Sequence, residues 1–431
     1  MKKSTLILIS FFISLTQVNA SIFTGISSSL PPDTEKTMLS LPESKEGLDK
    51  MRVLIFPHRL KNDWRHGKKD DPTVFSFISN KKDILVDNVN YQNITFKKEN
   101  NQILVFSNDQ QVKVDINLPL TINLPSKTKL LRKGNEDKSS SYQGQMKIHD
   151  YENGFRVIHH LGLEDYLKGV VPSESSASWP IESLKAQAVA ARSYAVFHKL
   201  STPPSRNYDV DDTARYQVFT GLSHHDSRTN LAVSETSGEI LTYNQKVIIA
   251  FFHAYSGGET DSAKRIFKMN NIPYCIGKRE DFSNEDLKAV ISSNIHWVIE
   301  WQKVWDKNKL LSSLKSLKEF NHFDLGEDYQ IEVLSRHQNI NKTINEMSFI
   351  QGSKKVNIDF FKMRSTLGWS HFNSYHFDIS EFDNNIIFNG YGWGHHVGMS
   401  QWSAYYMSKF LGSTYEDILY KFYHGVKLQK L

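Results

Sequence analysis

A glutamate two residues after a proline is the first of three groups in this sequence that could do chemistry. The segment Val170-Val171-Pro172-Ser173-Glu174 follows an apolar, strand-like stretch and precedes an expected helix. We expect the proline to hold the Glu174 carboxyl in a rigid turn, where partial burial would raise its pKa from about 4.3 toward neutrality. Such a carboxyl can serve as a general acid. The plainer alternative is a solvated loop glutamate.

A second stretch, residues 253–259 (HAYSGGE), follows the apolar run 247–252. A strand that ends in Ser256-Gly257-Gly258 would let backbone N–H groups approach a ligand closely. An ordinary turn is the alternative.

A third stretch, residues 390–401 (GYGWGHHVGMSQ), contains four glycines among aromatic and histidine residues. The glycines would let Trp393 and His395 project into a cleft, where an indole face is a good platform for a sugar ring. A tightly buried, glycine-rich crossing of two segments is the alternative.

The clearest element that could position these groups is a helix after Trp179. Pro180 suits its first turn, and Glu182 favours the positive end of the helix dipole. Apolar residues then recur at helical spacing, which predicts a central, buried, Ala-rich helix. They are Ile181, Leu184, Ala188, Ala191 and Ala195.

The remaining pattern predicts an α+β fold in two blocks. Residues 51–125 alternate short β-branched and aromatic runs with polar turns, which indicates a small β-rich N-terminal domain. The polar stretch 126–141 marks the expected boundary before a block of mixed strands and helices at 140–431. Expected strands are 52–56, 73–78, 84–87, 94–96, 103–106, 112–118, 145–149, 154–159, 238–243 and 246–253. The expected C-terminal helices are 401–410 and 415–423, the second with a capping box of Ser413 and Glu416 and an end at Gly425.

The N-terminus has the pattern of an export signal. Lys2 and Lys3 precede an apolar run at 6–15, and Val18-Asn19-Ala20 resembles a cleavage site. The run is about half of the ~20 residues that a spanning helix needs, so we expect a cleaved signal peptide at 1–20 and no permanent membrane span. An uncleaved anchor is the alternative. Residues 21–50 are expected to be a linker, and the working compartment would be the periplasm or the extracellular cell wall.

Composition excludes several classes of protein. The 431 residues carry 52 Lys and Arg against 47 Asp and Glu, a net charge of +5, which argues against a dedicated nucleic-acid binder. The single cysteine, Cys275, excludes an intramolecular disulfide framework and any Cys-rich metal site. We predict no cofactor. In an exported protein, glycans and peptides are more plausible substrates than nucleotides.

Taken together, four motifs resemble the SpoIID/LytB family of cell-wall proteins, and weaker similarities extend the match over residues 140–431. The resemblance implies lytic transglycosylase activity on peptidoglycan glycan strands, with Glu174 as the catalytic acid and base. It also makes a cell-wall amidase a candidate partner. The motifs are EDYLKGVVPSE (164–174), SWPIESLKAQAVAARSYA (178–195), AFFHAYSGGET (250–260) and GYGWGHHVGMSQWSAY (390–405).

Two departures from the family pattern are visible. Some members carry Cys-Asp-Thr-Thr-His-Cys, which resembles a metal-binding segment, where this chain has Asp-Asp-Thr-Ala-Arg-Tyr at 211–216. We therefore predict no zinc there. The family motif usually has glycine after its first histidine, whereas this chain has His396, whose side chain would narrow the cleft or change the backbone angles.

The resemblance also suggests substrate-binding residues, each with a structural alternative. Arg192 would bind a substrate carboxylate or form an ion pair within the core, and the ion pair is favoured. His395 would contact Glu174 or the sugar, or hold the loop together. The full expected set is Ser173, Arg192, Ser256, Gly257, Gly258, Trp393, His395 and Gln401, in one cleft with Glu174.

Two other functions remain open. A non-catalytic glycan-binding protein could stimulate an amidase, or a true hydrolase could add water. A hydrolase normally needs a second carboxylate about 5 to 9.5 Å from the first. Asp209, Asp211, Asp212 and Glu259 are the candidates for that role.

Overall fold

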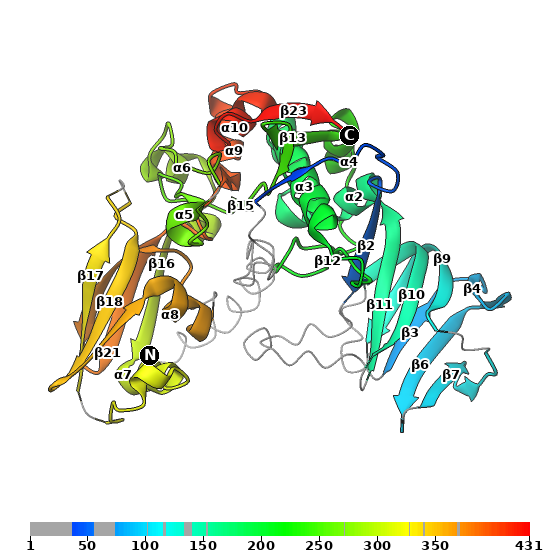
Figure 1. Cartoon of the computed structure of the whole chain (residues 1–431), viewed down its shortest axis with the longest axis horizontal. Coiled ribbons are helices and arrows are strands. Elements are labelled where there is room, and N and C mark those ends of the chain that lie inside the picture. The colour runs from blue at the N-terminus through cyan, green and yellow to red at the C-terminus, as the bar shows by residue number, and fades with distance from the viewer. Residues whose placement is uncertain are drawn as a thin grey trace, which may run out of the picture. The chain divides into compact units, whose positions relative to one another are not determined.

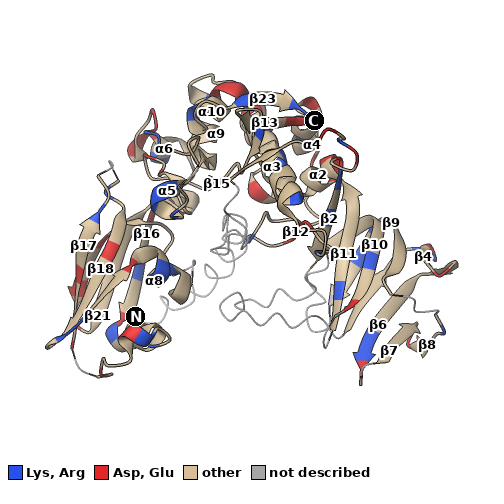
Figure 2. Cartoon of the chain, in the orientation of Figure 1, with Lys and Arg blue, Asp and Glu red and all other residues tan. Residues whose placement is uncertain are grey.

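A computed structural model describes residues 37–55, 74–100, 102–114, 118–132, 140–151, 154–270, 272–326, 328–338, 341–368 and 371–431. Helices and strands are interspersed, so the predicted α+β class is confirmed (Figure 1). The chain divides into two compact units, an N-terminal unit of Glu35–Ala250 with Val426–Leu431 and a C-terminal unit of Phe251–Gly425. Basic and acidic residues are both spread along the elements of each unit (Figure 2).

The N-terminal unit contains a large sheet in the order β12-β2-β11-β10-β9-β3-β6-β7-β8, with β4 on β9 and β5 on β4. Its described pairings are antiparallel except that of β12 with β2. The strands are β2 (Lys50–Ile55), β3 (Val74–Ile78), β4 (Ile84–Val86), β5 (Val89–Tyr91), β6 (Asn93–Glu99), β7 (Gln102–Ser107), β8 (Gln110–Gln111), β9 (Leu120–Arg132), β10 (Ser140–Tyr151), β11 (Gly154–Gly162) and β12 (Val210–Asp211).

Period-two alternation explains these strands. Alternate side chains of β3 and β6 are buried, and Phe75 stacks on Phe96 with ring centroids 5.3 Å apart. The same sheet includes β9 and β10, whose paired ends fall within the polar stretch 126–141 that we expected at a domain boundary. The expected strand 112–118 is not formed at residues 112–114 and 118, and the rest of it lies outside the described residues.

Over its described residues, the N-terminal unit also contains three helices and a second sheet. The helices are α2 (Leu163–Glu174), α3 (Ile181–Ser201) and α4 (Ser227–Glu235). The sheet has the order β1-β14-β13-β23, with β1 (Met38–Ser40), β13 (Glu239–Tyr243), β14 (Lys246–Ile248) and β23 (Lys427–Lys430). Thus part of the expected linker 21–50 is a strand of this sheet.

The predicted Ala-rich helix is α3, and most of its residues are buried. Pro180 is its N-cap residue, one position before the predicted first turn. The VVPSE segment, which we predicted to be a turn, is instead the end of α2. Buried residues Leu163, Tyr166, Leu167, Val170 and Val171 follow the i, i+3, i+4, i+7, i+8 spacing of a helix, and Pro172 lies within its last turn.

The described part of the C-terminal unit contains two antiparallel three-stranded sheets and a short parallel pair, β15 with β22. The strands are β15 (Phe252–His253), β16 (Glu300–Asp306), β17 (Gln330–Arg336), β18 (Ile344–Gln351), β19 (Lys354–Asp359), β20 (His376–Phe382), β21 (Asn385–Tyr391) and β22 (Met399–Ser400). The helices are α5 (Ala263–Ile266), α6 (Asn284–Val290), η3 (Ser293–Val298), α7 (Lys307–Leu314), η4 (Lys318–Phe320), α8 (Phe360–Leu367), α9 (Gln401–Phe410) and α10 (Tyr415–Phe422).

The bounds of the C-terminal helices α9 and α10 agree with the prediction to within one residue, whereas a strand and a capping box differ from it. The expected strand 246–253 is divided between β14 and β15. The capping box of α10 is formed by Thr414 and Asp417, one residue after the predicted pair, because the Thr414 hydroxyl accepts the Asp417 N–H.

In the part of the chain that the structure describes, no helix combines the length and apolarity needed to cross a bilayer. The predicted signal peptide at 1–20 lies outside the described residues, so it stays a prediction.

Candidate functional site

Glu174 is the last residue of α2, and its side chain is buried with 1% of its surface exposed. The backbone N–H of Val218 donates a hydrogen bond of 2.8 Å to its Oε1 atom. A carboxylate that accepts such a bond is held in one orientation, and the bond favours its ionised form. The carboxyl is therefore fixed by the protein.

Two buried tyrosines, Tyr166 of α2 and Tyr194 of α3, lie close enough to Glu174 for its charge to act on them. Burial raises the pKa of Tyr166 and of Tyr194 well above the usual value, and the negative charge of Glu174 adds to both shifts. The Tyr166 hydroxyl donates to Gln217 Oε1 at 3.2 Å, and Gln217 Nε2 donates to the Ala191 carbonyl at 3.2 Å. These bonds join α2 and α3 to the loop whose Val218 N–H binds Glu174.

Ser173, an expected substrate-binding residue, is also buried. Its hydroxyl donates to the Gly169 carbonyl at 2.8 Å, so its oxygen can accept from the Thr220 hydroxyl at 2.9 Å. These contacts tie α2 to the loop after β12, which indicates a structural role for Ser173.

Two of the other candidate carboxylates are engaged by basic side chains. Asp209 accepts from Arg52 Nη2 at 2.6 Å and pairs with Lys199 at 3.4 Å. Asp211 forms an ion pair with Arg215 and accepts from the Thr213 hydroxyl at 2.5 Å. Because both carboxylates are already occupied by basic side chains, these contacts disfavour a second acid–base role for Asp209 or Asp211.

The family-like metal segment at 211–216 does not fit a zinc ion in this chain. Zinc sites are built mainly from thiolates and imidazoles, and the segment has neither. Its Asp211 is already bound by Thr213 and Arg215. Over the described ranges, no group of three His, Cys, Asp or Glu residues is placed to hold a metal ion.

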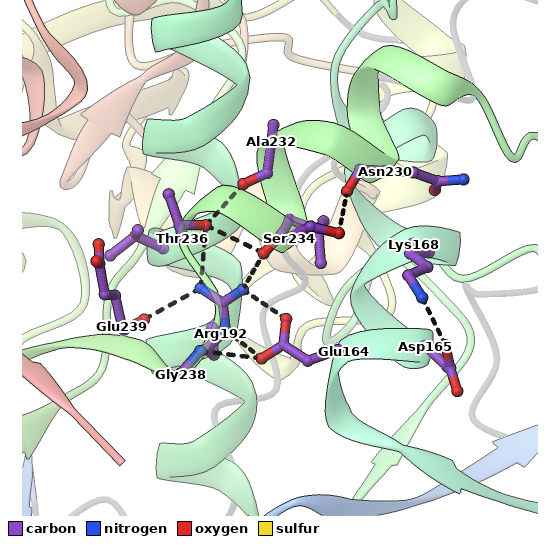
Figure 3. A network of polar contacts seen from close by, with 12 residues as sticks. Glu164, Asp165, Lys168, Arg192, Asn230, Ala232, Ser234, Thr236, Gly238 and Glu239 are labelled. Atoms are coloured by element: carbon purple, nitrogen blue, oxygen red, sulfur yellow. Dashed lines mark hydrogen bonds and ion pairs between the residues drawn. The ribbon is translucent and has the colours of Figure 1, made fainter.

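Arg192 has its guanidinium fully engaged by the protein (Figure 3). Nε and Nη2 donate to the two oxygens of Glu164 at 2.9 and 2.7 Å, in a bidentate pair. The remaining N–H groups donate to Thr236 Oγ1 and to the carbonyls of Val233 and Glu239. Because a guanidinium has five N–H donors, none is left for a substrate carboxylate. The geometry therefore agrees with the favoured interpretation that Arg192 forms an ion pair within the core.

In the C-terminal unit, the Ser256-Gly257-Gly258 segment forms a tight turn in which Gly257 has φ 78° and Gly258 has φ 115°. Asn341 Nδ2 donates to the carbonyls of Ser256 and Glu259 at 2.8 and 2.9 Å. A Cβ atom on Gly257 would lie 3.4 Å from the Gly392 nitrogen. The turn and the glycine-rich loop are therefore neighbours, as expected within this unit.

The glycine-rich loop presents a half-buried tryptophan. Trp393 exchanges backbone hydrogen bonds of 2.7 and 3.0 Å with Tyr255. Its ring meets that of Trp297 edge to face, with centroids 4.7 Å apart. Gly392, at φ 77°, leaves no room for a Cβ, which would lie 2.8 Å from the Tyr255 carbonyl oxygen. The loop thus fixes the backbone of Trp393, whose ring meets that of Trp297 from η3.

His395 is buried, with 1% of its surface exposed, so it is not placed on an open surface of its unit. The Val397 N–H donates to its Nδ1 at 3.0 Å, and its ring packs against Phe267 and His253. Burial lowers its pKa well below the usual value, which keeps the imidazole neutral. These contacts favour the structural alternative for His395.

The neighbouring His396 has φ 62°, so the side chain in place of the usual glycine sits on a left-handed backbone. Its ring is also fully buried. Gln401, the first residue of α9, is buried as well, at 2% exposure.

Glu280 is a residue that our sequence reasoning missed. It lies in the charged run 278–281, yet it is buried. Its Oε1 accepts from the Ser256 hydroxyl and, at 2.6 Å, from the Ser403 hydroxyl, which in turn lies 2.5 Å from that of Ser400. Burial raises the pKa of Glu280 to about 7. This carboxyl joins the SGG turn to the start of α9, and no sequence signal distinguishes it from a surface charge.

The expected site residues therefore fall into two groups. The N-terminal unit holds Ser173, Glu174 and Arg192, and the C-terminal unit holds Ser256, Gly257, Gly258, Trp393, His395 and Gln401. Within the C-terminal unit, the turn and the loop are brought together. That one cleft contains both groups stays a prediction.

Comparison with known proteins supports the resemblance to the SpoIID/LytB family. The model of the family described as "SpoIID: Stage II sporulation protein" matches residues 151–243. An uncharacterized protein of Brachyspira hyodysenteriae is 35% identical over 287 residues, which cover 67% of this chain and 72% of that protein. A stage II sporulation protein D of Bacillus amyloliquefaciens is 31% identical over 304 residues, 65% of this chain and 78% of its own length. An amidase enhancer of Bacillus subtilis is 26% identical over 293 residues, 61% of this chain and 40% of its own length.

Proposed function

This chain belongs to the SpoIID/LytB family, whose named members place it in cell-wall biology, and we propose that it is an exported peptidoglycan lytic transglycosylase with Glu174 as its general acid and base. Its substrate would be the MurNAc–GlcNAc bond of glycan strands, and its product would carry a 1,6-anhydroMurNAc end. The export pattern at 1–20 supports a site of action in the periplasm or the outer cell wall, where the enzyme would remodel the wall.

The observation that carries the proposal is the setting of Glu174. Its buried carboxyl is oriented by the Val218 N–H, while Asp209 and Asp211 are held by basic residues. A lytic transglycosylase needs only one such carboxyl, because its nucleophile belongs to the substrate. A hydrolase normally needs two.

The proposed steps balance without water. The Glu174 carboxylic acid gives its proton to the glycosidic oxygen as the bond from that oxygen to MurNAc C1 breaks, which leaves a free 4-hydroxyl on GlcNAc. The carboxylate then accepts the proton of the MurNAc C6 hydroxyl while O6 bonds to C1. The enzyme regains its proton, and the anhydro ring is closed.

Trp393 and its partner Trp297 would contribute to glycan binding. Aromatic faces bind the apolar faces of sugar rings, and these two half-buried indoles meet edge to face, from the loop of Gly392 and from η3.

The test is to digest purified glycan strands with the protein and to weigh the products. The proposal predicts anhydroMurNAc ends, one water lighter than reducing ends. Reducing ends would instead establish a hydrolase.

A second candidate function is that of a non-catalytic glycan-binding enhancer of a cell-wall amidase. The similarity to the Bacillus subtilis amidase enhancer favours it. Absence of any cleavage, together with stimulation of an added amidase by both the wild type and Glu174→Gln, would support this function over the first.

A further inference from the structure

The loop after β12 is closed by a cluster of side chains around Asp211. This aspartate is fully buried and accepts the N–H of Thr213 at 3.0 Å and its hydroxyl at 2.5 Å. Its other oxygen forms the ion pair with Arg215, four residues along the chain. Thr213 Oγ1 also accepts the backbone N–H of Arg215 at 3.2 Å. Asp211, Thr213 and Arg215 are therefore linked to one another by hydrogen bonds and an ion pair.

The closed loop leads directly to Glu174. The Phe219 N–H donates to the Asp212 carbonyl at 3.2 Å, and the Tyr216 N–H donates to that of Thr213 at 3.0 Å. Between these two bonds the chain presents the Val218 N–H to Glu174 Oε1. The position of that donor is therefore set by the closure of residues 211–219.

The side chain of Arg215 is placed to hold the loop 211–219 closed. Its side chain is 26% exposed, and its guanidinium lies 5.5 Å from the Tyr216 ring centroid, over the ring. The planar fork of arginine can hold a carboxylate and stack on an aromatic ring at once, which lysine does less well.

We infer that Arg215, through its ion pair with Asp211, is a positioning residue that fixes the Val218 N–H against Glu174 and so sets the proton affinity of the proposed acid. The inference rests on the proposed function for the role of Glu174, whereas the positioning itself can be measured without substrate.

Other ionisable groups also act on Glu174 from the elements around it. Tyr166 of α2 and Tyr194 of α3 are neutral, because burial and the nearby carboxylates raise the pKa of both. Asp211 and Asp212 help to raise the pKa of Tyr166, whereas the positive charge of Arg215 acts to lower that of Tyr194, so charges of both signs lie near Glu174. A test must therefore separate loop position from charge.

The test uses the full chain and follows the Val218 amide by hydrogen exchange and the Glu174 carboxyl by NMR titration. In Arg215→Ala we expect Val218 exchange to become about tenfold faster and the pKa of Glu174 to rise by about one unit, because a bond to the ionised form is weakened. Asp211→Asn should also speed Val218 exchange. A pure charge effect would leave exchange unchanged in both variants.

The matched control is Lys168→Met, which removes a cation from an exposed ion pair with Asp165 on the helix of Glu174. Lys168→Met should leave Val218 exchange and the pKa of Glu174 unchanged. Arg215→Lys should change both quantities less than Arg215→Ala does. If Arg215→Ala does not fold, Asp211→Asn carries the test, since its side-chain oxygen still accepts from Thr213. Unchanged Val218 exchange in the folded variants would overturn the inference.

Activity separates this inference from the proposed function. A higher Glu174 pKa moves the alkaline limb of the rate profile of Arg215→Ala to higher pH, because the acid must be protonated to act. If Glu174→Gln cleaves normally, the proposed function fails, whatever the exchange data show. If Glu174→Gln is inactive and Val218 exchange is unaffected by Arg215→Ala, only the positioning role fails.

Discussion

The buried carboxyl of Glu280 should contribute stability that falls as pH rises, and Glu280→Gln should remove that contribution. Its pKa is raised from 4.5 to about 7, chiefly by burial, while hydrogen bonds from Ser256, Ser403 and Ser400 offset part of the shift. Between these values the folded state holds a proton that the unfolded state releases. Stability from this group is therefore fully present below about pH 4.5 and is lost as pH rises to about 7.

The size of the effect follows from the shift. A change of about 2.5 units corresponds to about 3 kcal/mol of unfolding free energy, at about 1.4 kcal/mol per unit. In Glu280→Gln, the new amide keeps an oxygen acceptor for the hydroxyls of Ser256 and Ser403 and carries no charge. The variant should thus gain about 3 kcal/mol relative to the wild type on going from pH 4.5 to pH 8.

The assay is urea unfolding of both proteins at several pH values between 4.5 and 8, followed by tryptophan fluorescence. Glu285→Gln is the control, because Glu285 is an exposed carboxyl five residues away, and it should show no such pH-dependent gain. A constant free-energy difference between Glu280→Gln and the wild type over this range would refute the reasoning.

Three further predictions concern other parts of the molecule. Glu164→Ala should destabilise the protein by about 3 kcal/mol in urea unfolding, because the fully buried Arg192 would lose its bidentate partner, and a loss under about 1 kcal/mol would contradict this. Gly398→Ala should lower the thermal midpoint far more than Gly412→Ala, since both glycines have φ near 70° but only the first would place its Cβ 2.0 Å from the Phe251 carbonyl oxygen. Equal effects of about 1 kcal/mol would show that the loop can move aside. A chelator should leave the rate of glycan cleavage unchanged, because residues 211–216 offer neither thiol nor imidazole, and inhibition reversed by zinc would contradict this.

Elements with strong local signals were predictable from the sequence. The helix at 401–410 was predicted with the observed bounds, and the Ala-rich helix after Trp179 begins within one residue of the expected start. The strands at 74–78 and 93–99 were expected at 73–78 and 94–96, because short β-branched and aromatic runs stand there between polar turns. In these segments, local pattern and tertiary burial agree.

Where the prediction of α2 failed, one residue outweighed a longer pattern. Pro172 suggested a turn, because a proline past the first turn of a helix removes a hydrogen bond and crowds the carbonyl four residues earlier. Tyr166, Leu167, Val170 and Val171 nevertheless had helical spacing, and the burial of this apolar face outweighs that cost. For the site, this means that Glu174 is the last residue of a helix, with its carboxyl bound by the Val218 N–H.

Contacts between residues far apart in the sequence could not be predicted from local patterns. Glu280 stands in a run of charged residues, and its burial depends on hydroxyls at 256 and 403, which are far away in sequence. Likewise, the engagement of Arg192 depends on α2, α4 and the start of β13. Sequence could name Glu174 and Arg192 as notable, but only the fold shows that the guanidinium of Arg192 is fully used.

The central claim is most directly tested by cleavage of purified glycan strands by Glu174→Gln beside the wild type, with strand binding measured for both. The amide keeps an acceptor for the Val218 N–H but cannot supply the proton. The account predicts that release of anhydroMurNAc ends falls by about a hundredfold or more while binding changes little. Cleavage by Glu174→Gln at the wild-type rate would contradict it.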